Sequence, residues 1–570
     1  MKSITPFRSF LYLSLFICIV SHTEGRKTDQ RQQVNILWLV AEDLSPYMPP
    51  FGDSTIRTPN LSRLAAEGVR YTNVFSVSGV CAPSRAALAT GMYPSSIGAH
   101  NMRTLNQQAA AKEKGLINYE CVPPPHIKMV SEILREHHYY CTNNSKQDYQ
   151  FQPSKMAWDE SSVYAHWRNR PIGKSFFSIF NFNVTHESNI WNPRYWAYNL
   201  DAFPPDRNLK NWRKQFQGVN KPLFVSENLE VEIPPYLPST ELVVDDIRRM
   251  YSNVVEMDRQ VGLILRQLEE DGLLDHTIIV WYTDHGGPLP RQKRLCYDSG
   301  LKVPMIIRYP DRKGAGTIDD QLISFVDFAP TLLSMADIQP PDYLQGRAFA
   351  GPHASHQKRN YIHAAGDRFD EHYDMIRVVR DKRFKYLNNY QPEKGYYLAV
   401  EYRERMATMQ ELLRLRDEGK LNDAQMQWFR NSKPEEELFD TENDPHELFN
   451  LADDPRYTEV ILGLRSECNR WTSEIDDMGL IPETELIERF WPDKKQPHTS
   501  MPKMEGENGR IKIVCATPGA SIGYKFSGDQ DPSKGWAIYQ QPIDVPEGQS
   551  LKVIAHRIGY APSDTLVVKN

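Results

Sequence analysis

The sequence predicts an α/β protein built on a mainly parallel sheet, with a small β-sandwich at its C-terminal end. Over most of the chain, apolar runs of strand length alternate with amphipathic segments, which is typical of a parallel sheet covered by helices. Residues 511–570 instead contain short alternating segments separated by turn dipeptides. A chain of 570 residues is also too long for one ordinary core, so we expect a large and a small domain.

The first buried strand is predicted at residues 34–41, which form a nearly continuous apolar run. A short helix is expected next, with Thr58 as its N-cap, Pro59 at its first position and Gly68 just past its end. This helix leads to a second strand at residues 69–75.

The alternation continues through the middle of the chain. The expected elements are a helix at residues 127–137, strands at 139–142 and 176–182, a long helix at 245–270, and strands at 277–283 and 303–308. In the long helix, Ile247, Met250, Val254 and Met257 begin an apolar repeat every three or four residues. Strands alternating with helices favour a parallel arrangement.

The N-terminal residues have the layout of a secretory signal peptide. Lys2 and Arg8 precede the apolar run at residues 10–20, and small and polar residues follow it. We therefore expect residues 1–25 to be removed and the protein to be secreted or periplasmic. The apolar run is shorter than the ~20 residues of a membrane-crossing helix, so no stable membrane span is expected.

The remaining chain is expected to divide at a polar, proline-containing stretch. Residues 26–489 form the large domain, with a C-terminal subdomain from about residue 360, and residues 490–508 form the linker. Residues 509–570 form the β-sandwich. We expect Trp536 and Tyr539 in its core, because aromatic residues at strand spacing pack there more often than they stack on a sugar.

Charge and cysteine content exclude some classes of protein. A formal net charge of -6 disfavours nucleic acid and anionic membranes as partners, so an anionic substrate needs locally placed cations. The seven cysteines, of which Cys18 lies in the predicted signal peptide, lack metal-finger spacing. One disulfide among the others is compatible with an oxidising compartment.

Two acidic pairs are predicted at one edge of the sheet. Glu42 and Asp43 directly follow the first strand, and Asp284 and His285 directly follow the strand at residues 277–283. Ligands of open α/β sheets sit beyond the carboxyl ends of the strands. The oxygen-rich set favours calcium or magnesium over zinc. The alternative is that each pair only caps the next helix.

A cysteine stands just ahead of another predicted helix. Cys81 begins the run Cys-Ala-Pro-Ser-Arg, and a helix N-terminus attracts anions. Arg85 follows closely enough to return to the same site. Only three residues separate the two, which excludes the Cys-x5-Arg loop of phosphatases. The alternative is a small buried cysteine beside a proline turn.

This run matches the signature Cys-x-Pro-Ser/Ala-Arg of the sulfatase family, which the chain resembles from about residue 34 to residue 470. The resemblance implies an alkaline-phosphatase-like α/β fold. It also implies oxidation of Cys81 to formylglycine by a separate partner, either a formylglycine-generating enzyme or an anaerobic sulfatase-maturating enzyme. The hydrate of formylglycine offers one oxygen to attack sulfur and a second to expel sulfate.

The family pattern makes Glu42, Asp43, Asp284 and His285 ligands of a calcium ion, with Asp284 also the base for the hydrate. Two of these residues depart from the common pattern. His285 occupies a place that is often Asn, and Glu42 stands where many members have Asp, so its extra methylene has to be accommodated beside the metal.

The resemblance also places cations around the sulfate group, namely Lys146, His186 and Lys293. His186 is the candidate proton donor to the leaving group, because imidazole titrates near neutral pH. Asp148 stands where many members have a His that contacts formylglycine. This departure makes Asp148 a candidate catalytic residue and leaves the source of the protons open.

The substrate implied by the resemblance is a sulfated glycan. Residues 366–374 resemble the corresponding region of heparan N-sulfatase and bacterial glycan sulfatases, which favours an N-sulfoglucosamine sulfohydrolase-like activity. Arg368 and His372 are candidate substrate-binding residues, with a charged surface hairpin as the alternative. The C-terminal residues resemble the small β-sandwich appended to many hexosaminidases and sulfatases.

Three alternatives to this function remain. One is a sulfatase that acts on other O-sulfated polysaccharides. The second is a phosphodiesterase or phosphatase of the same superfamily, although such enzymes usually carry a Ser or Thr nucleophile and His-rich zinc ligation. The third is an inactive glycan-binding homologue, which would result if Cys81 were never converted.

Overall fold

The computed structural model describes residue 1 and residues 33–104, 115–191, 223–505, 510–528 and 535–569. The predicted signal peptide therefore lies, apart from Met1, outside the described residues. Val34–Asn570 form one compact unit.

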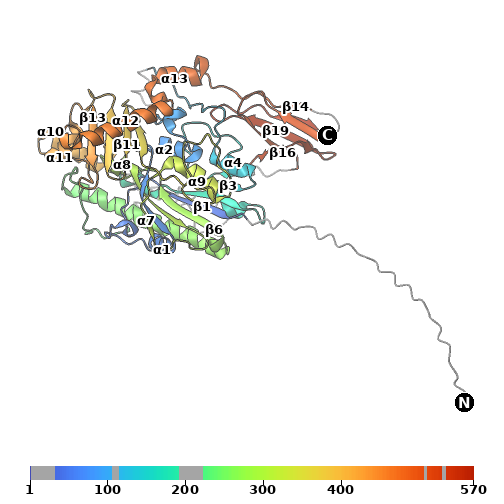
Figure 1. Cartoon of the computed structure of the whole chain (residues 1–570), viewed down its shortest axis with the longest axis horizontal. Helices are drawn as coiled ribbons and strands as arrows, with labels where there is room; N and C mark the ends of the chain where they lie inside the picture. The colour runs from blue at the N-terminus through green and yellow to red at the C-terminus, as the bar shows by residue number, and fades with distance from the viewer. Residues whose placement is uncertain (2–32, 105–114, 192–222, 506–509, 529–534, 570) are drawn as a thin grey trace. The chain divides into compact units, whose positions relative to one another are not determined.

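A mixed, mostly parallel sheet forms the centre of this unit (Figure 1). The order of its strands is β4-β3-β5-β1-β6-β7-β2-β8, and β9 also pairs with β2. The strands are β1 (Asn35–Ala41), β2 (Val69–Phe75), β3 (Tyr140–Asn144), β4 (Glu160–Ser161), β5 (Phe176–Phe182), β6 (Thr277–Thr283), β7 (Lys302–Arg308), β8 (Ile318–Asp319) and β9 (Ile323–Ser324). Only β7 runs antiparallel to its two neighbours. The predicted fold class is confirmed.

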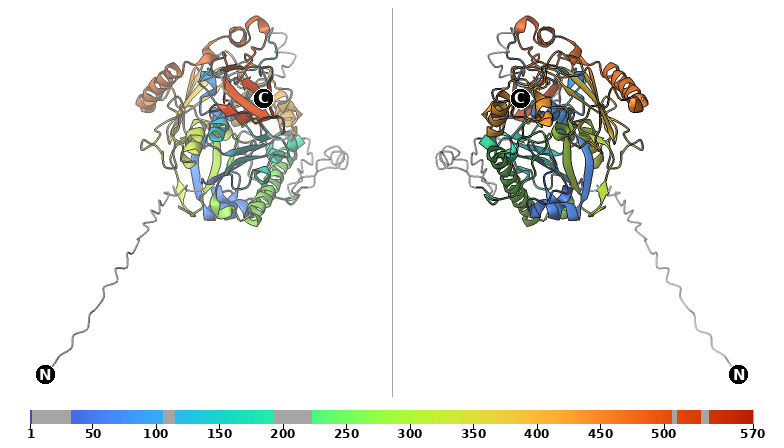
Figure 2. Two further views of the ribbon diagram at one scale, coloured as in Figure 1. Left: turned by 90° about the vertical axis from the view of Figure 1, so that its right-hand side faces the viewer. Right: turned by 90° about the vertical axis from the view of Figure 1, so that its left-hand side faces the viewer.

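Helices cover both faces of this sheet, which explains the apolar runs of its central strands. Trp38 of β1 packs on one face with Phe177 and Tyr282, where α2 (Cys81–Thr90), α4 (Val130–Glu136) and α9 (Phe328–Met335) also lie. Leu37 and Leu39 point to the other face, which α1 (Pro59–Glu67) and α7 (Glu241–Glu270) cover. The long green helix in Figure 2 is α7.

The predicted ends of α1 are correct in position but not in mechanism. Thr58 precedes the helix without a side-chain capping hydrogen bond. Gly68 follows it with an extended backbone, at φ -133°, so the glycine is not needed for a left-handed turn. A Cβ atom at this position would instead lie 2.5 Å from the carbonyl oxygen of Ile307. The glycine lets the chain pass close to β7.

A second, antiparallel sheet begins near the predicted subdomain boundary. Its strands, in order, are β10 (Ile362–Gly366), β11 (Ile376–Arg380), β12 (Phe384–Asn389) and β13 (Glu436–Asp440). Helix α12 (Thr458–Glu474) packs against it. The remaining described α-helices are α5 (Ser188–Trp191), α8 (Asp298–Leu301), α10 (Ala407–Asp417), α11 (Asp423–Met426) and α13 (Glu483–Phe490).

Two small antiparallel sheets form the C-terminal part. One contains β14 (Lys503–Glu505), β15 (Arg510–Val514) and β18 (Ile543–Asp544), and the other contains β16 (Ser521–Phe526), β17 (Ala537–Ile538), β19 (Ser550–His556) and β20 (Leu566–Lys569). Tyr539 packs on their shared core, as predicted, and its hydroxyl accepts a hydrogen bond from the backbone N–H of Ile513 at 2.9 Å. The prediction is wrong for Trp536, which lies outside that core and is only half-buried.

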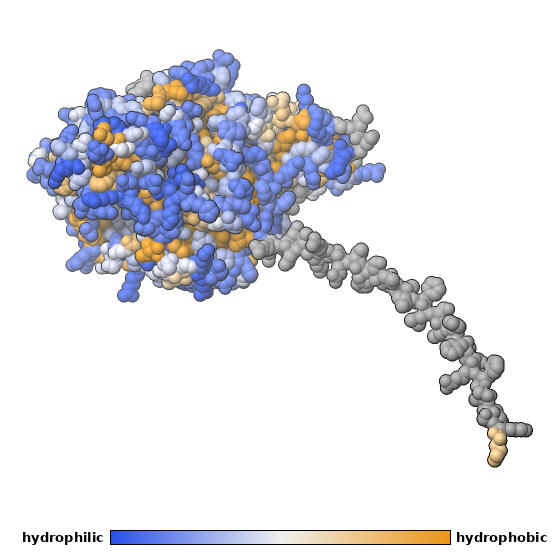
Figure 3. All heavy atoms as spheres, in the orientation of Figure 1, coloured by the Kyte–Doolittle hydropathy of each residue, from blue (hydrophilic) through white to orange (hydrophobic). Residues whose placement is uncertain are grey.

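The surface and the cysteines fit an ordinary globular chain. On the face drawn in Figure 3, hydrophilic residues predominate and apolar residues gather in small, separate groups. All six described cysteines are free thiols, so no disulfide joins them. None of the described helices combines the length and the apolar character that crossing a membrane requires.

Candidate functional site

Four neighbouring parallel strands end at one edge of the central sheet and bring the predicted residues together. The strands are β3, β5, β1 and β6, in that order across the sheet. Just beyond their carboxyl ends lie Lys146, His186, the pair Glu42 and Asp43, and the pair Asp284 and His285. Parallel strands thus explain how residues distant in sequence reach one site.

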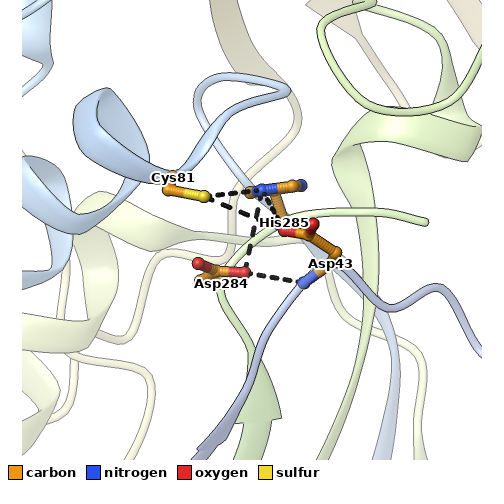
Figure 4. A group of neighbouring side chains, drawn as sticks. All are labelled: Asp43, Cys81, Asp284 and His285. Carbon is orange, nitrogen blue, oxygen red and sulfur yellow. Dashed lines mark hydrogen bonds and ion pairs between the residues drawn. The ribbon is translucent and has the colours of Figure 1, made fainter. Parts of the chain in front are cut away.

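Asp43, Cys81, Asp284 and His285 form the centre of the site, shown in Figure 4. Each offers one atom to a group whose members all lie within 4.8 Å of one another. His285 Nε2 is 3.0 Å from Asp43 Oδ1 and 3.3 Å from Cys81 Sγ. The backbone N–H of Asp43 donates to Asp284 Oδ1 at 3.1 Å. All four side chains are buried.

The backbone of Asp43 turns sharply immediately after β1. Its φ is 47°, in the left-handed region that few residues other than glycine adopt. Aspartate tolerates this conformation better than most residues, and the turn directs its carboxylate back over the end of the sheet. Such strain is found preferentially at functional sites.

Asp43 and Asp284 remain charged despite their burial, because cations surround them, whereas burial raises the pKa of Glu42. Burial raises the pKa of Asp43, but the charges of Lys293, His186 and His285 lower it by more than burial raises it. The pKa of Asp43 therefore lies well below its ordinary value. Burial likewise raises the pKa of Asp284, whereas His285, Arg85 and Lys146 bring it down to about 2. In turn, Asp284 and the other anionic groups outweigh burial and raise the pKa of His285 to about 10. The carboxylates of Asp43 and Asp284 are therefore ionised and close enough together to serve as ligands of a cation.

The donor set also fits a hard divalent cation. Glu42, Asp43 and Asp284 supply carboxylate oxygens, which calcium and magnesium prefer. Glu42 Oε2 accepts a hydrogen bond from Lys146 Nζ at 2.7 Å, so the side chain of Glu42, one methylene longer than that of aspartate, extends to Lys146. Its other oxygen, Oε1, is buried and has no hydrogen-bond partner. An orphaned buried carboxylate oxygen is costly unless a ligand or ion satisfies it.

Cys81 connects this charged centre to an open cavity. It is the first residue of α2, and its Sγ lies 3.8 Å from Asp43 Oδ1. Cys81 also lines a cavity of about 370 Å³, together with Lys146, Asp148 and His186. A group attached at position 81 would therefore face both the carboxylates and any molecule in the cavity.

Acidic partners hold the predicted cations in place. Lys293 Nζ is 2.7 Å from Asp43 Oδ2 and 3.4 Å from His186 Nε2. Arg85 Nε donates to Asp284 Oδ2 at 3.0 Å, and its NH1 donates to Asn181 Oδ1 at 2.7 Å. These contacts fix the cations before an anionic ligand arrives.

Asp148 and His186 lie at the cavity but differ in their surroundings. Asp148 Oδ2 is 3.9 Å from Lys146 Nζ, and its side chain is one-third exposed. His186 Nδ1 lies 2.9 Å from Ser188 Oγ. Burial, followed by Lys293, lowers the pKa of His186 to about 3, so its imidazole is neutral at neutral pH in the free site.

The two predicted substrate-binding residues are not part of this cluster. Arg368 is buried, and its Nε and NH2 donate to the carboxylate of Glu483 at 2.6 and 2.7 Å. His372 Nε2 donates to the carbonyl of Ala399 at 2.5 Å. Neither residue lines the cavity that contains Cys81. Their role in substrate binding stays a prediction.

A buried ion-pair network beside Lys293 was not predicted from the sequence. Glu187 accepts from Lys293 at 3.1 Å and from Arg294 NH2 at 2.9 Å. Arg294 Nε in turn lies 2.6 Å from Asp370 Oδ2, and Asp370 also pairs with Arg103. The only sequence signal for Glu187 is its position next to His186. The other members of the network give no signal, because they are charged residues that lie far from Glu187 in the sequence.

Known proteins are similar to this chain over most of its length. The family model described as Sulfatase matches residues 34–338, and the model described as N-sulphoglucosamine sulphohydrolase, C-terminal, matches residues 291–414. An ulvan-active sulfatase of Formosa agariphila is 54% identical over 549 residues, which cover 94% of this chain and 91% of that protein. The N-sulphoglucosamine sulphohydrolase of Homo sapiens is 24% identical over 82% of this chain and 95% of its own length.

Solved structures share the fold. A protein in complex with its substrate D-glucosamine-2-N,6-O-disulfate superimposes with a TM-score of 0.51 at 17% identity, covering 78% of this chain and 98% of that one. A 2-O GAG sulfatase gives a TM-score of 0.52 at 18% identity, with 78% and 93% covered.

Proposed function

The chain belongs to the sulfatase family, whose members are hydrolases, and from this premise we propose that it removes sulfate from a sulfated glycan by using formylglycine derived from Cys81 and a bound calcium ion. One observation carries the proposal. Cys81 Sγ lies 3.3 Å from His285 Nε2 and 3.8 Å from Asp43 Oδ1, between buried carboxylates and a cavity whose lining includes Lys146 and Arg103.

Glu42, Asp43, Asp284 and His285 are the proposed calcium ligands, and His285 would have to release the proton that it holds in the free site before its nitrogen could bind the ion. When bound there, calcium supplies positive charge that favours the oxygens of a sulfate group and of the nucleophile. At position 81, a formylglycine hydrate supplies two oxygens on one carbon, one to attack sulfur and one to release sulfate. Asp284 is the proposed base. Because its pKa is about 2, Asp284 is ionised at neutral pH. It therefore accepts a hydrogen bond from a hydroxyl group and orients it, but retains a proton poorly.

Lys146, Lys293 and Arg85 are proposed to hold the sulfate oxygens, because each lies beside a carboxylate of the site that contains Cys81, at 2.7, 2.7 and 3.0 Å. His186 is the proposed proton donor to the leaving oxygen. Its imidazole is neutral in the free site, but a bound sulfate ester adds a negative charge beside it, which raises its pKa. Asp148 accompanies Lys146 at the cavity and is proposed to orient that lysine.

Two glycans are candidate substrates. Ulvan is the first, because the 54% identical relative is an ulvan-active sulfatase. A glycan with N-sulfoglucosamine is the second, because residues 291–414 match the C-terminal model of N-sulphoglucosamine sulphohydrolase. The second agrees with the activity that the sequence resemblance favours.

The organisation of the whole protein is part of the same proposal. Residues 1–25 are a signal peptide, residues 26–489 the catalytic domain, residues 490–508 a linker that includes β14, which pairs with β15, and residues 509–570 the rest of the β-sandwich. The protein acts outside the cytoplasm. Its partner in maturation is a formylglycine-generating enzyme or an anaerobic sulfatase-maturating enzyme.

The proposal is tested on protein purified from its native host. We expect a tryptic peptide whose mass shows formylglycine at position 81, together with release of inorganic sulfate from ulvan or from N-sulfated glucosamine oligosaccharides. Release of phosphate from a phosphodiester, without release of sulfate, would favour the superfamily alternative. An unmodified thiol with no sulfate release from either glycan would overturn the proposal and favour a glycan-binding protein.

A pH dependence is expected from Glu120, which lines the same cavity as Cys81. Burial raises the pKa of this carboxyl to about 7, so it is neutral below pH 7 and negatively charged above it. A negative charge in the cavity repels an anionic substrate. We expect KM to rise about tenfold between pH 6 and pH 8, equivalent to about 1.4 kcal/mol. Initial rates with Glu120→Gln should lack this rise, and an unchanged pH profile of KM in that variant would refute the assignment.

A further inference from the structure

A large groove lies between the central domain and the C-terminal sheets. It has a volume of about 1620 Å³, and we call it the sandwich groove. Its lining includes Lys155, Tyr164, Arg170 and Lys174 on the central-domain side and Lys525 and Trp536 on the C-terminal side. In Figure 1, β16 lies beside α4, and residues of α4, β3 and β16 line the groove. The volume exceeds that of ordinary small-molecule sites, about 300 to 1,000 Å³.

Three cations of the sandwich groove form no ion pair with a carboxylate among the described residues. Among the described residues, no carboxylate lies within ion-pair distance of Lys155, Arg170 or Lys174. Arg170 donates instead to two backbone carbonyls, those of Lys174 and Trp167, each at 2.9 Å. The groove therefore presents uncompensated positive charge, which suits an anionic ligand.

Two acidic residues line the groove, Asp159 and Glu160, against five lysines and arginines. Asp159 Oδ1 is 2.9 Å from Arg135 NH2, so that pair is neutral overall. Glu160 Oε2 accepts a hydrogen bond from Asn169 at 2.7 Å, and burial raises its pKa.

Aromatic side chains accompany the cations. Trp536 is half-buried, with Lys525 Nζ 5.4 Å from the centre of its ring. Tyr164 and Tyr524 line the same groove. Flat aromatic faces next to charged and polar groups bind sugar rings through their apolar faces while the cations contact acidic substituents.

The walls of the groove are held in place across the two parts of the chain. The guanidinium of the buried Arg135 binds Asp159 and also donates from NH2 to the carbonyl of Trp536 at 2.7 Å. Ser521 of β16 donates to Glu132 of α4. A groove with fixed walls needs little ordering when a ligand binds.

The sandwich groove shares a wall with the cavity of Cys81. Gln147 lines that cavity, and its Nε2 donates to Ser161 Oγ at 2.7 Å. Ser161 lines the groove on the other side. Asn143 also donates to Ser161 Oγ at 3.1 Å, and to the carbonyl of Lys146 at 3.0 Å. A polymer with one unit in the cavity could therefore extend over this wall into the groove.

We propose that the sandwich groove binds a neighbouring stretch of the glycan chain, several sugar units long and carrying sulfate or carboxylate groups. The inference rests on the proposed function, because it takes the polymer in the cavity to be a sulfated glycan. It gives the C-terminal sheets a role in substrate recognition and predicts that long chains are preferred over short ones.

The test compares a double variant, Lys155→Ala with Lys174→Ala, and the single variant Trp536→Ala with the unsubstituted enzyme. With long ulvan chains we expect KM to rise at least about fivefold, equivalent to about 1 kcal/mol, while kcat changes less than about twofold. With ulvan disaccharide both constants should stay unchanged. The control removes two exposed lysines outside the groove, Lys313→Ala with Lys358→Ala, and should leave KM for long chains unchanged.

A binding measurement separates this inference from the proposed function. Long ulvan chains are titrated calorimetrically into the Cys81→Ala protein, with and without the groove substitutions, and melting temperatures confirm folding. Weaker binding in the groove variants supports the inference whether or not the enzyme releases sulfate. Equal binding by the groove variants and the control overturns it, even if sulfate release establishes the sulfatase.

Discussion

Cys81→Ala is expected to lower kcat for sulfate release by at least about 10⁴-fold, the scale seen when a catalytic nucleophile is removed. Alanine cannot be converted to formylglycine, so the site retains its cations but has no group to attack sulfur. The substitution removes only one small atom from a residue that also borders the cavity, so we expect the fold to persist. Sulfate release by ion chromatography and a melting curve measure the two effects.

Cys81→Ser sharpens this experiment. A serine hydroxyl can attack sulfur but offers no second oxygen on the same carbon to expel sulfate. We therefore expect stable sulfation of Ser at this position, detected as one added sulfate per chain in an intact mass measurement. Cys515→Ala is the matched control, because Cys515 is the one described cysteine that is not buried. Activity of Cys81→Ala within tenfold of the unsubstituted enzyme would rule out the assigned nucleophile.

Removal of calcium with EGTA is expected to destabilise the protein and abolish sulfate release. Without a divalent cation, the buried carboxylates of Glu42, Asp43 and Asp284 rely on lysine, arginine and histidine alone for charge compensation. At a calcium concentration of 100 times its Kd, binding adds about 2.7 kcal/mol to the free energy of unfolding. The melting temperature should therefore rise with calcium concentration, and added calcium should restore activity after chelation.

Asp43→Asn and Asp284→Asn test whether this response belongs to the proposed site. Both substitutions keep side-chain volume but remove one negative charge, so the melting temperature should become nearly independent of calcium. Asp440→Asn is the control, because Asp440 is an acidic residue of β13 that pairs with Arg383 outside the site. A calcium response that survives in both site variants would place the ion elsewhere.

The central fold could be predicted because its strands are unusually uniform. Residues 69–75, 176–182 and 277–283 have the observed bounds of β2, β5 and β6. Every residue of β5 and β6 is buried, so each strand is a continuous apolar run. Such a run is recognisable in the sequence even though apolar and polar residues do not alternate in it. The same parallel order brought Glu42, Asp43, Asp284 and His285 together, as the positions of these pairs after their strands predicted.

Other features depend on packing that one sequence does not contain. Gly68 is needed because β7 passes beside it, and that approach is set by a strand more than two hundred positions later. Trp536 was assigned to the core of the β-sandwich because of its strand spacing. That spacing does not show whether a side chain faces the core or the groove beside the central domain. Glu187, Arg294 and Asp370 pair through the tertiary fold, and no spacing between them signals an ion-pair network.

That ion-pair network connects the proposed site to two sheets at once. Lys293 and Arg294 lie between β6 and β7 of the central sheet, whereas Asp370 lies between β10 and β11 of the second sheet. Glu187 pairs with both Lys293 and Arg294. If the second sheet separated from the central sheet, Arg294 would lose the buried counter-charge of Asp370. Glu187 could then shift, and Lys293, which contacts Asp43, would shift with it. Inactivation on heating should thus reflect a local opening of the subdomain, well before the central strands lose their order.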